Sequence, residues 1–99
     1  MKMNDEFAYE VLSFVSEIPV GKVSTYGDIA KKLGYPGNSR LVARVLSNAS
    51  YYGSYPCHRV VNSVGRLAPS WDEQYDLLVS EGVEFSASKK VVLKFHLWK

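Results

Sequence analysis

The sequence predicts a mainly helical domain with one small β-hairpin. Apolar residues recur at helical spacing in several separate stretches, and a glycine-containing turn lies between two short extended segments in the second half. With 99 residues, of which 46% are hydrophobic, the chain can bury one core but not two independent ones. We therefore expect a single domain over residues 1–99.

The first expected helix begins at Asn4 or Asp5, either of which can cap it, and Pro19 with Gly21 ends it. Its apolar positions recur at helical spacing: Phe7, Val11, Leu12, Phe14, Val15 and Ile18. This helix should face the core.

A second helix is expected over residues 26–33. Ser24 or Thr25 can cap it, because a hydroxyl at that position accepts a hydrogen bond from the first turn. Gly34 follows the last periodic residue, as is typical of a helix C-terminus. A turn at residues 35–37 comes next.

Asn38 or Ser39 then starts a third helix that runs to about Ser47. Arg40 and Arg44 lie one turn apart on its polar face. Two short helices joined by a glycine-containing turn, with arginines near the start of the second, are typical of a helix-turn-helix.

A loop over residues 48–55 leads to the expected hairpin, in which residues 59–61 and 66–67 flank a turn at 62–65. A hairpin in this position forms a wing. The predicted fold class is therefore a mainly α winged helix-turn-helix.

A fourth helix is expected from about Asp72 to Ser80, with Gly82 after it. Its apolar set is Tyr75, Leu77, Leu78 and Val79. We expect a strand over residues 91–97, with Trp98 packing back on the domain.

Composition excludes several classes of protein. One cysteine forms no internal disulfide, and His58 and His96 are the only histidines, with no metal-ligand spacing. We expect no metal and no cofactor. The chain has neither a signal-peptide pattern nor a membrane-length apolar run, so we expect a soluble, cytoplasmic protein without membrane contact.

The run Pro56-Cys57-His58-Arg59-Val60 places the only thiol beside two basic residues. Positive neighbours favour the thiolate, which is the nucleophilic form. A lone cysteine without further context is more often a small buried apolar residue, so the surrounding motifs decide between the two interpretations.

Three motifs occur in order: IPVGKVSTYGDIA over residues 18–30, SRLV over residues 39–42 and PCHRVVNSVG over residues 56–65. With them the chain, from about residue 7 to 83, resembles the DNA-binding domain of the O6-alkylguanine-DNA alkyltransferases and the alkyltransferase-like proteins. The ending Leu97-Trp98-Lys99 is similar to the alkyltransferase-like branch.

The resemblance implies a protein that binds the minor groove of double-stranded DNA and flips O6-alkylguanine outward. Arg40 matches the arginine that enters the base stack, and Tyr26 matches the tyrosine that crowds the 3′ phosphate. Extrusion costs a few kcal/mol, which an inserted side chain and phosphate contacts can offset. A monomer suffices for this task.

Further polar residues are expected near the DNA. Backbone amides at the start of the third helix, around Ser39, can hold phosphates, with Lys22, Lys31 and Lys32 as outlying contacts. Asn62 and Ser63 are expected to contact the substrate, although a wing turn also needs such residues.

In the alkyltransferases a cysteine thiolate attacks the alkyl carbon on guanine O6. The resemblance makes Cys57 that nucleophile and His58 the residue that takes its proton through a water. The thioether product is stable, so each molecule acts once. Arg59 is expected to support the loops around the site.

Two features differ from the enzymes. Their relay glutamate, which orients the histidine, aligns with Tyr75, while Glu73 and Asp76 lie one or two positions off, so we expect this glutamate to be absent. Residues 66–71 replace the glycine-rich substrate loop. Both features resemble the alkyltransferase-like proteins, which bind the lesion without transfer and usually carry tryptophan or alanine in place of Cys57.

Three functions follow. The intact Cys57 motif favours stoichiometric transfer of the alkyl group. The two departures favour a non-enzymatic sensor that passes the lesion to nucleotide excision repair. A third, weaker alternative is a winged-helix regulator that reads sequence in the major groove through Arg40 and Arg44.

Overall fold

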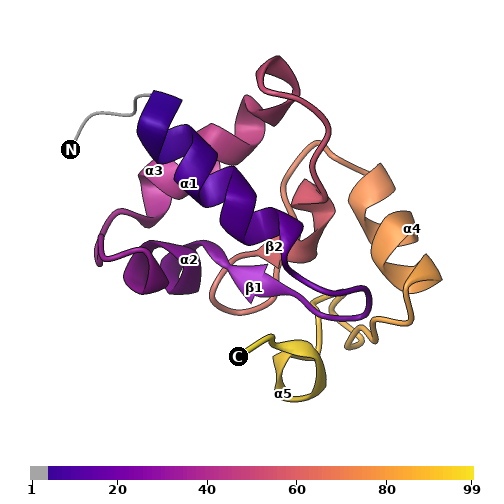
Figure 1. Cartoon of the computed structure of the whole chain (residues 1–99). Helices are drawn as coiled ribbons and strands as arrows, with labels where there is room; N and C mark the ends of the chain where they lie inside the picture. Colours follow the sequence, from indigo (N-terminus) through magenta and orange to yellow (C-terminus); the bar gives the residue numbers. More distant parts are fainter. Residues whose placement is uncertain (1–4) are drawn as a thin grey trace.

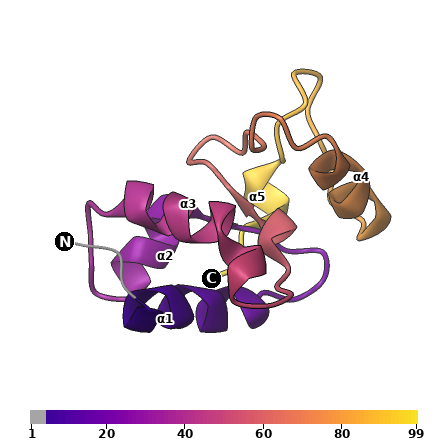
Figure 2. The same cartoon turned by 90° about the horizontal axis from the view of Figure 1, so that it is seen from above.

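Three helices make up one side of the molecule, and a longer C-terminal segment packs beside them (Figures 1 and 2). The computed structural model describes residues 5–99. The helical elements are α1 Asp5–Ser16, α2 Tyr26–Lys32, α3 Ser39–Ser47, α4 Glu73–Ser80 and α5 Leu93–His96, with short 3-10 turns η1 Ala49–Tyr51 and η2 Cys57–Arg59. Asp5 is the first residue of α1, while Asn4, the alternative cap, lies outside the described residues.

The helix-turn-helix is confirmed in its local detail. Thr25 caps α2, because its Oγ1 accepts a hydrogen bond of 3.1 Å from the backbone N–H of Asp28. Gly34 follows with a φ of +91°, a left-handed conformation that glycine adopts without strain. The turn then leads into α3, which packs against α2 and α1 (Figure 2).

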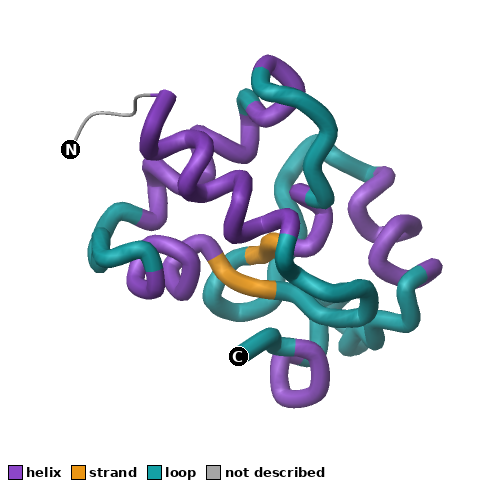
Figure 3. The backbone as a smooth tube through the Cα atoms, in the orientation of Figure 1, coloured by secondary structure: helices purple, strands orange, loops and turns teal. Residues whose placement is uncertain are grey.

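A pair of two-residue strands joins the two halves of the chain near the centre of the molecule (Figure 3). Strand β1, Ser24–Thr25, lies parallel to β2, Val60–Val61, with Ser24 beside Val60. The expected turn at residues 62–65 is present, since Asn62 N–H donates to Arg66 O at 3.1 Å. However, β2 pairs with β1 rather than with residues 66–67, because both of its valines are buried in the core.

The buried side chains form two clusters on either side of this strand pair. The larger lies between α1, α2 and α3, and includes Phe7, Leu12, Ile18, Ile29 and Val45. The smaller lies beneath the C-terminal segment and consists of Val23, Val61, Leu78, Val83 and Val91. Val60 and Val61 belong to different clusters, so the backbone just after Cys57 is anchored on both sides.

The tail differs from the expected strand. Residues 93–96 form α5, and extended pairing is limited to single bridges of Val23 with Leu97 and of Phe85 with Val91. The imidazole of His96 explains this, because it bonds to Gly21 O at 3.0 Å and to the N–H of Glu84 at 3.1 Å, which holds the backbone in a turn. Trp98 packs back as expected, with its ring 5.4 Å from that of Phe14.

Candidate functional site

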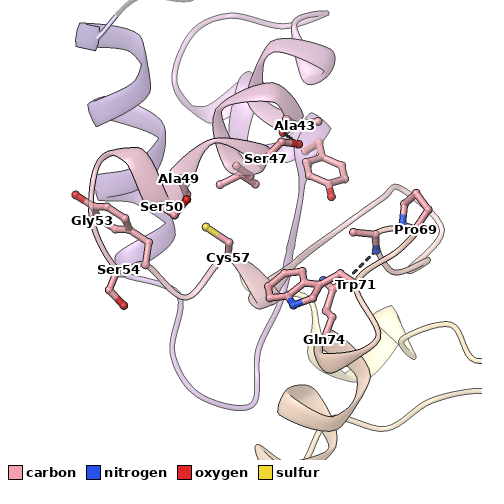
Figure 4. Close-up of a pocket in the computed structure, with 14 residues that line it drawn as sticks. Ala43, Ser47, Ala49, Ser50, Gly53, Ser54, Cys57, Pro69, Trp71 and Gln74 are labelled. Atoms are coloured by element: carbon pink, nitrogen blue, oxygen red, sulfur yellow. Dashed lines mark hydrogen bonds between the residues drawn. The ribbon is translucent and has the colours of Figure 1, made fainter.

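A cavity of about 580 Å³ opens beside Cys57 (Figure 4). One wall comes from the last turns of α3, from η1 and from the loop after it, and the other comes from the loop before α4. The lining residues are Tyr26, Ala43, Leu46, Ser47, Ala49, Ser50, Gly53, Ser54, Tyr55, Cys57, Ala68, Pro69, Trp71 and Gln74. Figure 4 shows the sulfur of Cys57 between the two walls, facing the open space.

Cys57 is held at the start of η2, directly before β2. Its N–H donates to Tyr55 O at 2.8 Å, and the N–H of Arg59 donates to Pro56 O at 3.1 Å. Burial raises the pKa of Cys57 to about 11. The expectation that basic neighbours favour the thiolate is therefore wrong for this structure, because burial acts against the charged form.

The basic neighbours of Cys57 are engaged by a carboxylate. The Nε2 atom of His58 lies 2.7 Å from Oε2 of Glu81. Arg59 donates from Nε to Oε1 and from Nη2 to Oε2 of the same residue, each at 2.9 Å. All three side chains are largely buried, and the positive charge is neutralised at Glu81 rather than directed at the sulfur.

Glu81 corrects the expectation that the carboxylate partner of His58 is absent. It is the residue that caps the C-terminus of α4. It lies more than one helical turn beyond Tyr75, the position at which the glutamate was expected. The resemblance had placed this glutamate within the helix. The signal that marks it is the Glu81-Gly82 pair, a glutamate at the helix end followed by a glycine with a φ of +85°.

The ionisation of Glu81 is controlled by the same contacts. Hydrogen bonds from Arg59 lower the pKa of Glu81, burial acts in the opposite direction, and His58 contributes a smaller lowering. Glu81 is therefore a carboxylate at neutral pH, and it accepts a hydrogen bond from the Nε2–H of His58. The Nδ1 atom is then the ring nitrogen that can accept a proton.

Arg59 supports the site as expected. Besides its two bonds to Glu81, its Nη1 donates to Ile18 O at 2.9 Å. This bond connects the cysteine motif to the start of the 18–30 motif. The two segments with the most distinctive sequence are thereby held together by one guanidinium group.

Gln74 is a site residue that sequence reasoning missed. It lies on the first turn of α4 with its side chain fully buried. Its Nε2 donates to His58 O and Val60 O, each at 3.0 Å, and its Oε1 accepts from the N–H of Ala68 at 2.7 Å. Gln74 follows the charged residues Asp72 and Glu73. Polar helix residues in such a stretch are usually exposed, so periodicity offered no signal.

Tyr26 and Cys57 lie in the same pocket. Tyr26 is the first residue of α2 and is half-buried, and its pKa is raised by burial, with a smaller contribution from the charge of Cys57. Ser39 and Arg40 begin α3, the helix whose last turns line the pocket wall. Arg40 is exposed and lies outside the lining.

The other residues expected to contact DNA lie at the surface, and they differ in how far their side chains already bind other groups of the protein. Asn62 uses Oδ1 to accept from the N–H groups of Val64 and Arg66, at 3.0 and 2.8 Å, so it builds the wing turn. Ser63 is exposed on that turn. Lys22 donates to Phe95 O at 3.2 Å, and Lys32 lies 5.7 Å from the ring centres of Phe14 and Trp98. Their roles toward DNA stay predictions.

Two negative findings hold across residues 5–99. No group of three or more His, Cys, Asp or Glu side chains in this part of the chain is arranged to hold a metal ion. Within the same described residues, no helix combines the length and apolar character needed to cross a bilayer.

Comparison with known proteins decides the family. Residues 6–83 match the family described as "6-O-methylguanine DNA methyltransferase, DNA binding domain". The chain belongs to this family. The three motifs and the Cys57 pocket all lie within the matched residues.

Two relatives in this family match along almost their whole length. A DNA base-flipping protein of Vibrio parahaemolyticus is 39% identical, over 96% of this chain and 98% of its own. Alkyltransferase-like protein 1 of Schizosaccharomyces pombe is 38% identical, over 96% of both chains. By contrast, a methylated-DNA–protein-cysteine methyltransferase of Methanosarcina acetivorans is 39% identical, but only 51% of its length is covered.

Solved structures divide in the same way, into those that this chain covers almost completely and those that it covers over about half of their length. S. pombe Atl1 in complex with damaged DNA containing O6-carboxymethylguanine has a TM-score of 0.84 at 37% identity, covering 100% of this chain and 99% of that one. Mycobacterium tuberculosis OGT in complex with DNA has a TM-score of 0.65 at 29% identity, covering 81% and 51%. The expected fold class is confirmed.

Proposed function

We propose that this protein binds DNA containing O6-alkylguanine, flips the damaged nucleotide through the minor groove and holds the base in the Cys57 pocket without altering it. The position of the pocket carries this proposal: α3 begins with Arg40 on the surface and ends in the pocket wall. Its volume of about 580 Å³ is within the range of about 300–1,000 Å³ found for small-molecule sites.

The relatives favour binding over transfer. Those that match along nearly their whole length are named as base-flipping or alkyltransferase-like proteins, whereas the methyltransferases match over part of theirs. In the proposed complex, Arg40 fills the space left by the extruded base and Tyr26 crowds the phosphate beside it. Phosphate contacts supply affinity that does not depend on sequence.

The test compares Arg40→Ala with Arg44→Ala, which removes the same charge one turn further along the exposed face of α3. Affinities are measured by fluorescence anisotropy on duplexes with O6-methylguanine or guanine at one position. The wild type should prefer the lesion, and Arg40→Ala should weaken lesion binding about tenfold, or about 1.4 kcal/mol. Arg44→Ala should weaken binding to both duplexes alike, through lost phosphate attraction.

Equal affinity of the wild-type protein for the two duplexes would end the proposal. A lesion preference that survives Arg40→Ala unchanged would remove the role of Arg40 as the inserted residue. A strong preference for one undamaged sequence would instead support the regulator alternative.

In the same proposal, the bound lesion is passed to nucleotide excision repair. Adding the protein to a reconstituted excision reaction should raise incision of an O6-methylguanine duplex, and Arg40→Ala should raise it less. Incision that does not change with added protein would contradict this step.

Transfer to Cys57 is the second candidate, and the His58–Glu81 pair favours it. The pair supplies a base that can take the thiol proton through a water. A sulfur–carbon bond then forms as the carbon–O6 bond breaks, and the departing guanine anion takes up a proton in its turn. The raised pKa of Cys57, about 11, opposes this reaction because little thiolate is present at neutral pH.

Intact mass separates the two candidates. After long incubation with excess O6-methylguanine duplex, a bound but unreactive protein keeps its mass, whereas transfer adds one methyl group. Cys57→Ser is the matched control, since it keeps the pocket but removes the sulfur. A methyl adduct on the wild type that Cys57→Ser lacks would establish transfer.

A further inference from the structure

A short hairpin between Phe85 and Val91, called here the lysine hairpin, lies beyond the residues that match the family. Phe85 and Val91 pair as an antiparallel bridge at its base. At its tip the N–H of Ser86 donates to Lys90 O at 2.8 Å, and the N–H of Lys89 donates to Ser86 O at 2.9 Å. Two adjacent lysines are therefore held on a closed turn.

Lys89 has an uncommon backbone conformation at this tip. Its φ is +62°, in the left-handed region, where a side chain costs free energy and glycine does not. Residues with such strain persist where their surroundings hold them, and they are concentrated at binding sites. Glycine would suit the turn better, which indicates that the lysine side chain itself has a use.

The lysine hairpin packs directly on the wing turn, residues 62–65. The N–H of Val91 donates to Gly65 O at 2.9 Å, and a Cβ on Gly65 would lie 2.5 Å from Val91 O. The wing turn also contains Ser63, which is exposed and is expected to contact DNA. A duplex that reaches the wing turn therefore lies beside the lysine hairpin.

Charge is segregated between two edges of the molecule. Residues 5–21 contain four acidic side chains and no lysine or arginine, whereas residues 85–99 contain four lysines and no acidic side chain. Figure 2 shows α1 along one edge and the lysine hairpin, drawn in yellow, projecting at the opposite edge. The edge that carries the hairpin therefore suits a polyanion, and the edge that carries α1 does not.

The two lysines of the hairpin have no carboxylate partner in the described part of the chain. Both ion pairs found within residues 5–99 involve Glu81. The ammonium of Lys89 instead lies 5.6 Å from the ring centre of Tyr75, a contact that leaves its charge without a counter-ion. Both charges are therefore available to an external anion.

We propose that the lysine hairpin is an additional phosphate-binding element, which contacts the DNA backbone on one side of the lesion next to the wing turn. This inference rests on the proposed function and adds to it a contact that lies outside the three sequence motifs. Because phosphates are the same at every base pair, Lys89 and Lys90 add affinity for damaged and undamaged duplexes alike, and the choice of base is left to the pocket.

The test uses Lys89→Gln, Lys90→Gln and the double variant. Lys99→Gln is the matched control, because it removes the same charge at the C-terminus, which Figure 2 shows on the side of α1. Dissociation constants are measured by fluorescence anisotropy between about 50 and 200 mM salt, the range over which phosphate contacts change affinity strongly. The duplexes carry guanine or O6-methylguanine at one position.

Each single variant should reduce the slope of log affinity against log salt concentration by about 1, and the double variant by about 2. The loss should be the same on both duplexes, so the preference for the lesion stays as in the wild type. Lys99→Gln should keep the slope of the wild type. A double variant with an unchanged slope would overturn the proposal.

Lys89→Gly separates a binding role from a structural one. Glycine removes the backbone strain together with the charge, so the thermal unfolding midpoint should be kept or raised while affinity falls as in Lys89→Gln. A midpoint that falls together with the affinity would show that Lys89 acts through the fold, and this would overturn its role as a DNA contact.

Shortening the duplex locates the contact. Removing base pairs from one flank of the lesion should abolish the difference in affinity between the wild type and the double variant, whereas removing them from the other flank should preserve it. A difference that persists on both shortened duplexes would reflect the general charge of the protein and would overturn a local contact.

The proposed function and this inference fail in different ways. A wild type that binds both duplexes alike, with a smaller salt slope in the double variant, overturns lesion recognition and supports the phosphate contact. A wild type that prefers the lesion, with the same salt slope in the double variant, supports lesion recognition and overturns the phosphate contact.

Discussion

Glu81 shows how one residue can organise the charges around a thiol. It accepts hydrogen bonds from His58 and Arg59, and Arg59 also reaches Ile18 O. The two basic side chains that follow Cys57 in sequence are therefore committed to a carboxylate. The thiol is left in a half-buried pocket whose chemistry is set by desolvation rather than by charge.

Replacing this carboxylate should alter how stability depends on pH. The lowered pKa of Glu81 means that its contribution is present above the unfolded-state value of about 4.3 and is lost as pH falls toward the folded-state value. At neutral pH, Glu81→Gln should lose about 1.5–3 kcal/mol of unfolding free energy. Thermal unfolding between about pH 3 and 7 should show the difference from wild type shrinking at the acid end.

Glu84→Gln is the control for this experiment. Glu84 is exposed, and its bond to His96 comes from the backbone N–H, which the substitution keeps. Glu84→Gln should leave the dependence of protein stability on pH as it is in the wild type. Parallel stability curves for the wild type and Glu81→Gln across the whole range would contradict the role given to Glu81.

The thiol should react slowly with a small alkylating reagent. With a pKa of about 11, Cys57 is almost wholly protonated at neutral pH, and the thiolate appears only as pH rises toward that value. Iodoacetamide, followed by intact mass, should modify Cys57 at least about tenfold more slowly than a short cysteine peptide near pH 7.5. Equal rates would show that the sulfur is not desolvated.

The sequence predicted the site residues that belong to contiguous motifs and missed those that depend on folding. Cys57, Tyr26 and Arg40 lie within the three motifs, and the structure places Cys57 and Tyr26 in one pocket. Gln74 and Glu81 were missed because their partners around Cys57 lie 14 to 23 residues away, and the Glu81-Gly82 pair marks the end of a helix but not those partners. The altered loop before α4 also obscured the alignment of Glu81.

At the scale of elements, strongly periodic or capped segments were predictable and the tail was not. The helices α1, α2, α3 and α4 follow from apolar spacing and end signals, and each appears close to the expected bounds. The tail became α5 because His96 bonds to Gly21 and Glu84, both remote in sequence. A pattern over residues 91–97 contains no information about those partners.

The wing turn should be intolerant of a side chain at Gly65. Its φ is +86°, and a Cβ there would lie 2.5 Å from Val91 O, a backbone atom that cannot move freely. Gly65→Ala should therefore lose about 1–3 kcal/mol of stability, measured by urea unfolding.

Gly27→Ala provides the opposite case within the same experiment. Gly27 lies in α2, and a Cβ at this position would have no neighbouring atom within 4 Å outside its own helix turn. Alanine should stabilise this helix by up to about 1 kcal/mol. A Gly65→Ala protein as stable as the wild type would contradict the close packing of the wing turn on the tail.

At the scale of the whole molecule, the two core clusters lie close together on either side of the strand pair β1–β2. The Cα radius of gyration is 12.6 Å, close to the value of about 13 Å expected for a folded domain of roughly 100 residues. That residues 1–99 fold as a single domain stays a prediction. One cooperative unfolding transition, seen alike by fluorescence and by circular dichroism, is the result expected of it.

The tail should stabilise the helical half through Trp98. Its backbone N–H donates to Val23 O at 2.8 Å, and its indole ring packs against Phe14 and Lys32. Because the indole is only half-buried, Trp98→Ala should cost about 1–2 kcal/mol, less than a fully buried tryptophan. Urea unfolding should show a lower midpoint with an unchanged slope.

Phe95→Ala is the matched aromatic control, since Phe95 is 56% exposed. It should change stability by no more than about 0.5 kcal/mol. If Trp98→Ala were equally neutral, the tail would not be part of the cooperative unit.

The pairing of Val23 has a consequence for the nascent chain. Its N–H donates to His96 O at 2.9 Å, and its carbonyl oxygen accepts from the backbone N–H of Trp98. Because His96 and Trp98 lie far along the chain, both leave the ribosome long after Val23. The residues that line the pocket end at Gln74 and emerge before these partners. Until these partners emerge, the backbone N–H and C=O of Val23, directly before β1, have no partner, and we expect this unpaired edge to be where neighbouring nascent chains can associate.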